Sequence, residues 1–216
     1  VHLFCSDPDK VTKNVLNHAP VVVSENVMQH LCTTASPPPY LATFKQPNAS
    51  IESLFEHTSP FILVVDKLQD PGNIGTLLRT ALAFGITGIV ITQHTVDPWS
   101  PKVIRSSAGA IFSVPVVLSD TTIETVLTQC RQHQLTCYLT AAHRADALHY
   151  YQANYKAPCA LILGSEGNGV DTNTISPELL NECQWITIPT SGRVESLNVS
   201  ISGCLLYTSP SPRDSI

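Results

Sequence analysis

Two segments of the chain combine glycine with charged or amide side chains directly after an apolar run. The first, "DKLQDPGNIGTLLRT" (66–80), contains a Pro-Gly turn, Asn73 at the position expected for a helix N-cap, and Arg79 further along the same helix. The second, "LGSEGNGV" (163–170), holds three glycines and Glu166. Arginine can clamp a phosphate, and glycine lets other groups approach a backbone closely. Taken alone, a capped helix and a plain turn would also explain these segments.

A third segment, "IPTSGRVESLNVSIS" (188–202), places Ser196, Asn198 and Ser200 at alternate positions where a helix begins. Buried polar side chains are costly unless they have partners, so these groups are solvated, or they serve a ligand or a neighbouring backbone. An ordinary strand-to-helix loop with a serine cap is the structural alternative. The glycine spacing of the second segment is G-x-x-G-x-G rather than G-x-G-x-x-G, which argues against a nucleotide-dependent oxidoreductase.

From residue 60 onward, apolar runs alternate with segments of helical periodicity. Strands are expected at 61–66, 88–92, 114–118, 135–142, 159–164 and 184–189, and helices at 73–85, 101–112 and 122–134. Strands that are apolar on both faces and separated by helices predict an α/β fold, a parallel sheet with helices on both faces. Ligands bind beyond the carboxyl ends of such strands, which is where the three polar segments begin.

Composition narrows the class of protein. The 216 residues are 43% hydrophobic with a formal net charge of -5, which argues against a protein that holds nucleic acid by bulk charge alone. No apolar run is long enough to cross a bilayer. The seven scattered cysteines predict reduced thiols in a cytosol-like compartment. Cys130, His133 and Cys137 flank a helix end and should diverge, so no metal site is expected.

The chain divides into three expected parts. Residues 1–59 are rich in proline, with a short helix capped by Ser24 and a strand at 40–44, and we interpret them as a partial small substrate-binding domain and a linker. Residues 60–207 form the α/β domain. Pro210 and Pro212 should end the last helix near Tyr207, so residues 208–216 are expected to be a disordered or non-native tail, and the sequence from about Gly203 onward is unlike a natural ending.

Taken together and in this order, "DPGNIGTLLRTA", "LGSEGNG" and "IPTSGRVESLNVS" resemble the three signature motifs of the SpoU/TrmH class of SPOUT methyltransferases, which methylate ribose 2'-hydroxyls of RNA. The resemblance covers about 61–202. It implies a C-terminal deep trefoil knot, a rare exception to the rule against knots. It also implies a homodimer, and it suggests that residues 1–59 belong to an RNA-binding accessory domain.

The resemblance implies that S-adenosylmethionine is the cofactor and that main-chain groups hold much of it. The matching cofactor-binding positions are Thr140, Ala141, Gly164, Glu166, Gly167, Ile188, Pro189, Ser196 and Leu197. The matching catalytic positions are Asn73, Arg79, Glu166, Ser196 and Asn198. Arg79, Arg144 and Arg193 are the expected RNA-binding residues, with Lys102, Arg105 and His143 as further candidates near phosphate or substrate.

These residue types suit methyl transfer to a hydroxyl group. A ribose 2'-hydroxyl is a poor nucleophile until it loses its proton, so the enzyme must supply alignment and a proton acceptor. Arginine is a poor base, which favours Arg79 as a clamp on the phosphate beside the target ribose, with that phosphate or a water taking the proton. Methylation of rRNA is favoured over tRNA. Methylation of a base and a non-catalytic RNA-binding relative are the alternatives.

Overall fold

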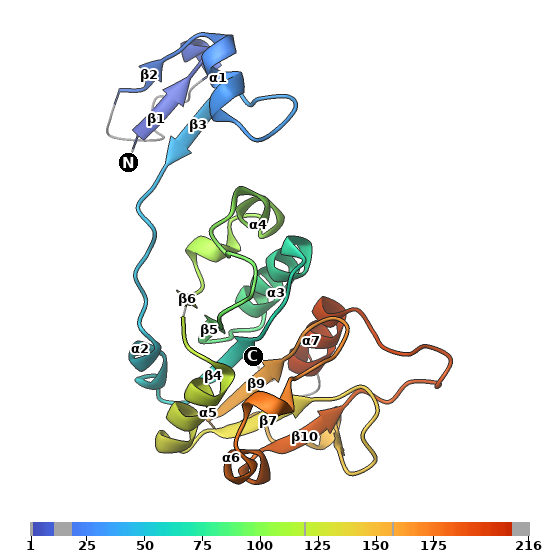
Figure 1. Ribbon diagram of the computed structural model, residues 1–216. Coiled ribbons are helices and arrows are strands. Elements are labelled where there is room, and N and C mark those ends of the chain that lie inside the picture. Colours follow the sequence, from blue (N-terminus) through green and yellow to red (C-terminus); the bar gives the residue numbers. More distant parts are fainter. Residues whose placement is uncertain (1, 11–18, 119, 157, 209–216) are drawn as a thin grey trace. The chain divides into compact units, whose positions relative to one another are not determined.

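The computed structural model describes residues 2–10, 19–118, 120–156 and 158–208, and the chain forms two compact units (Figure 1). The first unit is Val1–Pro47 and the second is Asn48–Ile216. The second unit contains all three polar segments singled out above. The expected tail, 208–216, lies outside the described residues except for Thr208.

The first unit is built on a three-stranded sheet. Strand β1 (His2–Cys5) pairs in parallel with β2 (Val21–Val22) and antiparallel with β3 (Tyr40–Thr43). A short turn of 3-10 helix, η1 (Pro8–Lys10), follows β1, and helix α1 (Glu25–Leu31) follows β2. The Ser24 hydroxyl accepts a hydrogen bond from the Val27 amide, as expected for a capping serine. The expected helix and strand of this unit are therefore both present.

The segment expected to be a linker before residue 60 is partly folded. Residues 51–55 form helix α2 (Ile51–Phe55), which Ser50 caps. Leu54 is buried, and a Cβ at Gly88 would lie 2.4 Å from it. Phe55 stacks on His133 with ring centroids 4.2 Å apart. These contacts attach α2 to the second unit, so the division between the units falls after Pro47 rather than after residue 59.

A seven-stranded sheet forms the centre of the second unit, with strand order β6-β5-β4-β9-β7-β10-β8 and parallel pairing throughout. Its strands are β4 (Phe61–Val65), β5 (Gly88–Ile91), β6 (Val116–Leu118), β7 (Thr136–Thr140), β8 (Leu148–His149), β9 (Cys159–Leu163) and β10 (Gln184–Thr187). Every residue of the central strands β4 and β9 is buried. The predicted α/β class and parallel sheet are confirmed, and β8 is an edge strand that the sequence did not predict.

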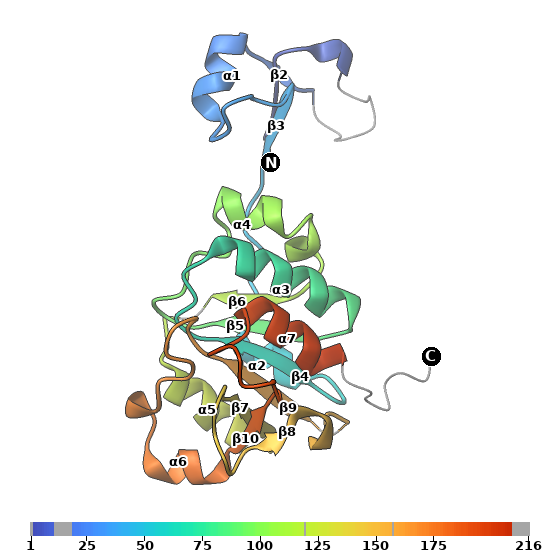
Figure 2. The same cartoon turned by 90° about the vertical axis from the view of Figure 1, so that its right-hand side faces the viewer.

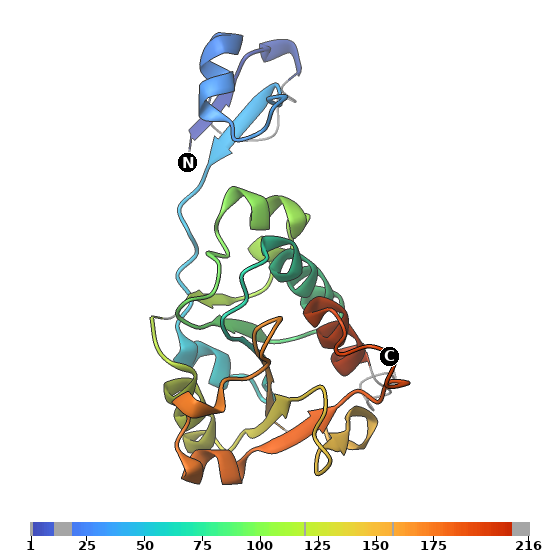
Figure 3. The same ribbon diagram turned by 45° about the vertical axis from the view of Figure 1, so that its right-hand side comes forward.

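Helices cover both faces of this sheet (Figures 2 and 3). On one face lie α3 (Pro71–Ala83), α4 (Pro101–Ser106), the 3-10 turns η2 (Ala110–Phe112) and η3 (Tyr150–Gln152), and α7 (Val199–Thr208). On the other lie α2, α5 (Ile123–Gln132), the 3-10 turn η4 (Thr172–Thr174) and α6 (Pro177–Glu182). The expected helix 101–112 is interrupted after Ser106, because the backbones of Ala108 and Gly109 have φ angles of 48° and 88°, outside the helical region. No helix among the described residues is long and apolar enough to cross a membrane.

Close packing of α3 against its neighbours depends on two glycines. A Cβ on Gly75 would lie 2.0 Å from the Ser106 hydroxyl oxygen and 2.7 Å from the Ser106 carbonyl carbon, at the contact with α4. A Cβ on Gly203 of α7 would lie 2.5 Å from Leu77. Because α3 begins at the polar segment 66–80, these contacts fix where that segment lies relative to α4 and α7.

The Gly75 contact predicts how a larger side chain at this position changes the stability of the protein. Alanine normally favours a helix over glycine, yet we expect Gly75→Ala to lower the free energy of unfolding by about 1–3 kcal/mol because the Ser106 backbone cannot move away easily. Ala83→Gly, at an exposed position of the same helix, should cost less than about 1 kcal/mol through helix propensity alone. Urea titrations of both variants measure this, and stabilisation by Gly75→Ala would contradict tight α3–α4 packing.

Candidate functional site

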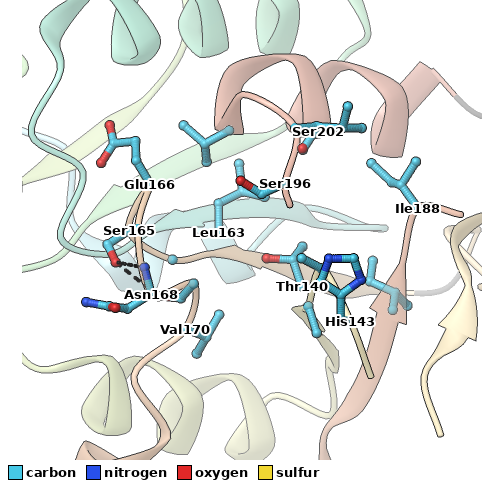
Figure 4. A pocket seen from close by; sticks show the side chains of 18 of the residues that line it. Thr140, His143, Leu163, Ser165, Glu166, Asn168, Val170, Ile188, Ser196 and Ser202 are labelled. Atoms are coloured by element: carbon cyan, nitrogen blue, oxygen red, sulfur yellow. Dashed lines mark hydrogen bonds between the residues drawn. The ribbon is translucent and has the colours of Figure 1, made fainter. Parts of the chain in front are cut away.

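A cavity of about 460 Å³ opens at the carboxyl ends of β7, β9 and β10 (Figure 4). It is lined by three separate segments. They are the residues after β7 (140–143), the loop after β9 (163–170), and the end of β10 with the following loop and the start of α7. In a parallel sheet this edge is where ligands bind. A cavity of this volume is in the usual range for small-molecule sites.

The cavity brings together most of the positions expected to bind a cofactor. Those that line it are Thr140, Ala141, Gly164, Glu166, Gly167, Ile188, Ser196 and Leu197. Pro189 is not one of the lining residues, although its neighbours Ile188 and Thr190 are. The sequence did not single out Trp185, Ser165, Asn168, Val170 or Ser202, which also line the cavity.

The three polar segments are joined by a chain of side-chain hydrogen bonds, which we call the amide relay. Glu166 accepts through Oε1 from the Asn73 Nδ2 amide at 3.1 Å and from the Asp70 backbone amide at 3.4 Å. Asn198 in turn donates through Nδ2 to the Asn73 Oδ1 at 3.0 Å. The carboxylate has no donor, so it requires the Nδ2 side of Asn73, and Asn73 then presents Oδ1 to Asn198.

Asn198 also caps helix α7. Its Oδ1 accepts from the backbone amides of Ser200 at 3.0 Å and Ile201 at 3.2 Å, and from the Ser200 hydroxyl at 2.6 Å. Ser200 is buried, so this bond satisfies a hydroxyl group that has left water. The alternate polar residues therefore have different surroundings: Ser196 lines the cavity, Asn198 starts the helix, and Ser200 packs beneath it.

The expected N-cap of α3 was wrong. Asp70, not Asn73, has the extended backbone of a cap, and its carboxylate accepts from the Asn73 amide at 2.9 Å. Pro71 occupies the first helical position, where proline is favoured, and this signal in the sequence could have located the cap. Because Asp70 caps the helix, the side chain of Asn73 is available for the amide relay.

The loop after β9 closes tightly on itself. Ser165 and Gly169 exchange backbone hydrogen bonds at 2.9 and 3.0 Å. A Cβ on Gly164 would lie 2.0 Å from the Gly169 carbonyl carbon, so glycine is required there by the loop's own backbone. A Cβ on Gly167 would meet nothing within 4 Å. The expectation that both glycines leave room for a ligand therefore fits Gly167, whereas at Gly164 the neighbouring backbone is the constraint.

An ion pair holds the end of the same loop. The Lys67 ammonium donates to Asp171 Oδ2 at 2.8 Å, with about a third of each side chain exposed. The hydrogen bond with Lys67 lowers the pKa of Asp171 below its ordinary value, and the hydrogen bond with Asp171 raises the pKa of Lys67. Both shifts have the direction expected of a formed pair. No pattern in the sequence indicates this contact, because its two residues lie far apart in the chain.

The expected RNA-binding arginines have different surroundings. Arg79 is exposed on α3, and Arg193 is exposed in the loop before α7. Arg144 pairs with Asp146 at 2.7 Å and lies 4.3 Å above the Trp185 ring, and the hydrogen bond from Arg144 lowers the pKa of Asp146. Part of the charge of Arg144 is therefore neutralised locally. Neither Arg79 nor Arg193 lines the cavity, and neither does Arg144.

Other candidates lie around this edge. His143 lines the cavity, and its Nε2 donates to the Glu195 carbonyl oxygen at 2.6 Å, which ties the end of β7 to the loop before α7. Lys102 and Arg105 are exposed on α4. In the described part of the chain, no three His, Cys, Asp or Glu side chains gather as a metal site, and Cys130 is buried while His133 stacks on Phe55.

An all-parallel α/β sheet with a cavity at its carboxyl edge, lined by two of the three polar segments and by residues 140–143, defines a ligand-binding α/β protein. Residues 60–207 match the sequence model of the SpoU rRNA Methylase family. The match covers more than half of the chain, and the chain therefore belongs to the SpoU rRNA Methylase family.

Individual relatives agree with this assignment. The chain is 34% identical over 190 residues to an uncharacterized tRNA/rRNA methyltransferase from Synechocystis, covering 86% of this chain and 65% of that protein. It is 30% identical over 185 residues to the Bacillus subtilis 23S rRNA (guanosine(2553)-2'-O)-methyltransferase RlmP, covering 86% and 69%. The AdoMet-bound rRNA methyltransferase from Sinorhizobium meliloti has a similar structure, with a TM-score of 0.77, 25% identity, and coverage of 96% and 78%.

The amide relay predicts energetic coupling between α3 and the start of α7. We expect Asn73→Ala and Asn198→Ala each to destabilise the protein by about 0.5–1.5 kcal/mol, and the double variant to lose less than the sum by about 0.5–1.5 kcal/mol. A double-mutant cycle by urea unfolding measures this coupling. Asn73→Ala combined with Asn168→Ala is the matched control and should be additive, and additivity in both pairs would contradict the relay.

Proposed function

We propose that this protein is an S-adenosylmethionine-dependent methyltransferase acting on a ribose 2'-hydroxyl in structured RNA. The observation that carries the proposal is the single cavity formed by all three cofactor-matching segments, with Glu166, Asn73 and Asn198 bonded together at its side. Family membership supports the same reaction class. The chain spans 65% of the length of the first Synechocystis relative and 37% of the length of a second tRNA/rRNA methyltransferase from the same organism. The activity of the whole protein is therefore part of the proposal.

The residues present fit the proposed cofactor. The cavity floor is apolar at Leu163 and Val170, and polar groups occur at Thr140, Ser165 and Ser196. Gly167 leaves the backbone of its loop open to a ligand. S-adenosylmethionine would supply an activated methyl group there. The loop backbones would bind and orient it, and Leu197 would contribute an apolar wall.

The chemistry requires this chain to hold the target hydroxyl and to manage one proton. Arg79, exposed on α3 and outside the cavity, is suited to clamp the phosphate beside the target ribose rather than to remove a proton itself. That phosphate or a water would accept the proton. The role of Asn73 and Asn198 in this proposal is to fix α3, and with it Arg79, relative to the cavity.

Four finer statements belong to the same proposal. Ribosomal RNA is favoured over tRNA, because the relative RlmP is described as a 23S rRNA enzyme. A homodimer is supported by Ile201 and Leu205, which are 50% and 37% exposed on one face of α7. A trefoil knot is proposed from membership of the SpoU rRNA Methylase family. A cytosolic location is supported by the odd number and scattered positions of the seven cysteines in the sequence.

Cofactor binding provides the first test. We expect the protein to bind S-adenosylmethionine in a calorimetric titration, and Leu197→Arg to weaken binding at least about a hundredfold by placing an unpaired charge in the cavity. Arg79→Ala, outside the cavity, should leave the affinity unchanged within about twofold. Leu197→Met controls for the loss of leucine. An affinity lost in Arg79→Ala and kept in Leu197→Arg would contradict the assigned pocket.

Methyl transfer provides the second test. Tritium from labelled S-adenosylmethionine should enter an rRNA transcript as a 2'-O-methylated nucleotide, recognisable because alkali cannot cleave the chain at that ribose. Arg79→Ala should slow transfer about a hundredfold or more, and Arg79→Lys should restore only part because lysine lacks the bidentate fork. Label found on a base, or no label despite cofactor binding, would favour a base methyltransferase or a non-catalytic relative.

A further inference from the structure

The backbone of Lys67 has a conformation that lysine rarely adopts. Its φ is 58°, in the left-handed region where glycine and asparagine are favoured. The Lys67 amide donates to the Thr95 hydroxyl at 2.8 Å, which holds the residue at the turn between β4 and α3. A strained backbone that keeps a long charged side chain, where glycine would fit without strain, suggests that the side chain has a role.

The side chain of Lys67 reaches the loop that carries Gly164, Glu166 and Gly167. Its ammonium pairs with Asp171 at 2.8 Å, one residue beyond the cavity-lining Val170. Asp171 also caps the 3-10 turn η4 by accepting from the Asn173 amide. The ion pair therefore fixes the point where the loop ends and η4 begins.

The same loop has a second attachment near its tip. Glu166 accepts from Asp70 and Asn73, which lie in the segment that also contains Lys67. Segment 66–73 thus holds the loop at two points, at Glu166 and at Asp171. Between them the loop is closed by the Ser165–Gly169 hydrogen bonds. Gly167, which lines the cavity, lies between these two attachment points.

We propose that Lys67 and Asp171 are positioning residues for the cofactor loop, and that their ion pair holds residues 164–170 in the shape that accepts the ligand. Neither residue lines the cavity, so neither touches the ligand itself. The inference rests on the proposed function for the identity of that ligand. The inference goes beyond the proposed function because it assigns a role to Lys67 and Asp171. Neither residue is among the expected cofactor-binding or catalytic positions.

The test uses a substitution that separates this role from a structural one. Lys67→Gly removes the ammonium and relieves the backbone strain at φ 58°, so the melting temperature should be unchanged or higher. The affinity for S-adenosylmethionine should nevertheless fall about two- to fivefold, the size expected for a partly exposed ion pair. Hydrogen exchange of the amides in 164–171 should become faster. A role in stability alone would lower the melting temperature instead.

Matched variants complete the experiment. Asp171→Asn keeps a capping side chain and removes the charge, so it should reproduce the Lys67→Gly effects, and the double variant should lose no more affinity than either single one. Lys67→Arg should retain wild-type affinity. Unchanged affinity or unchanged loop exchange in Lys67→Gly would overturn the inference. Failure of the wild-type chain to bind S-adenosylmethionine would overturn the proposed function. Faster hydrogen exchange of the loop in the variants would still establish that the Lys67–Asp171 ion pair holds residues 164–170 in shape.

Discussion

The arrangement of the candidate site depends on the orientation of one side-chain amide, that of Asn73. Glu166 can only accept, so it takes the Nδ2 of Asn73 and leaves Oδ1 for Asn198. Asn198 must then donate with Nδ2, and its own Oδ1 is left to cap α7. One carboxylate thus determines the direction of a hydrogen-bond chain that crosses from the β9 loop through α3 to α7, and no member can be reversed without breaking a bond.

This chain of bonds explains how a cavity can form from distant parts of the sequence. The sheet brings the carboxyl ends of β7, β9 and β10 to one edge, which is a property of parallel pairing. Sheet geometry alone would leave the following loops free to vary. The His143–Glu195 hydrogen bond connects the segments after β7 and β10, and the amide relay connects the β9 loop through α3 to the segment after β10. The Lys67–Asp171 pair connects the β9 loop to the segment after β4. Together these contacts hold the loops in place around the cavity.

Much of the fold could be predicted because its signals are local. Apolar runs such as 61–66 and 159–164 became the buried strands β4 and β9, and the spacing of Ile74, Leu77 and Leu78 indicated the buried face of α3. Sequence and structure differ where two local signals compete. Asp70 and Asn73 both suit a cap, and Asp70 takes that position in α3, while Ser50 lies in the expected linker but caps α2. Contacts such as Lys67–Asp171 and Arg144–Trp185 join distant residues and leave no pattern in a single sequence.

The two attachments of the β9 loop to segment 66–73 affect which substitutions the protein can tolerate during evolution. In that segment Asp66, Lys67 and Asp70 all form hydrogen bonds with other parts of the chain, and Gln69 bonds to the His94 carbonyl. The exposed loop 189–195 is held through main-chain atoms, such as the Glu195 carbonyl. Substitutions should therefore be selected against in the first segment and accumulate at 191–194 of the second, which do not line the cavity, so descendants could acquire different RNA preferences while the cofactor pocket stays intact.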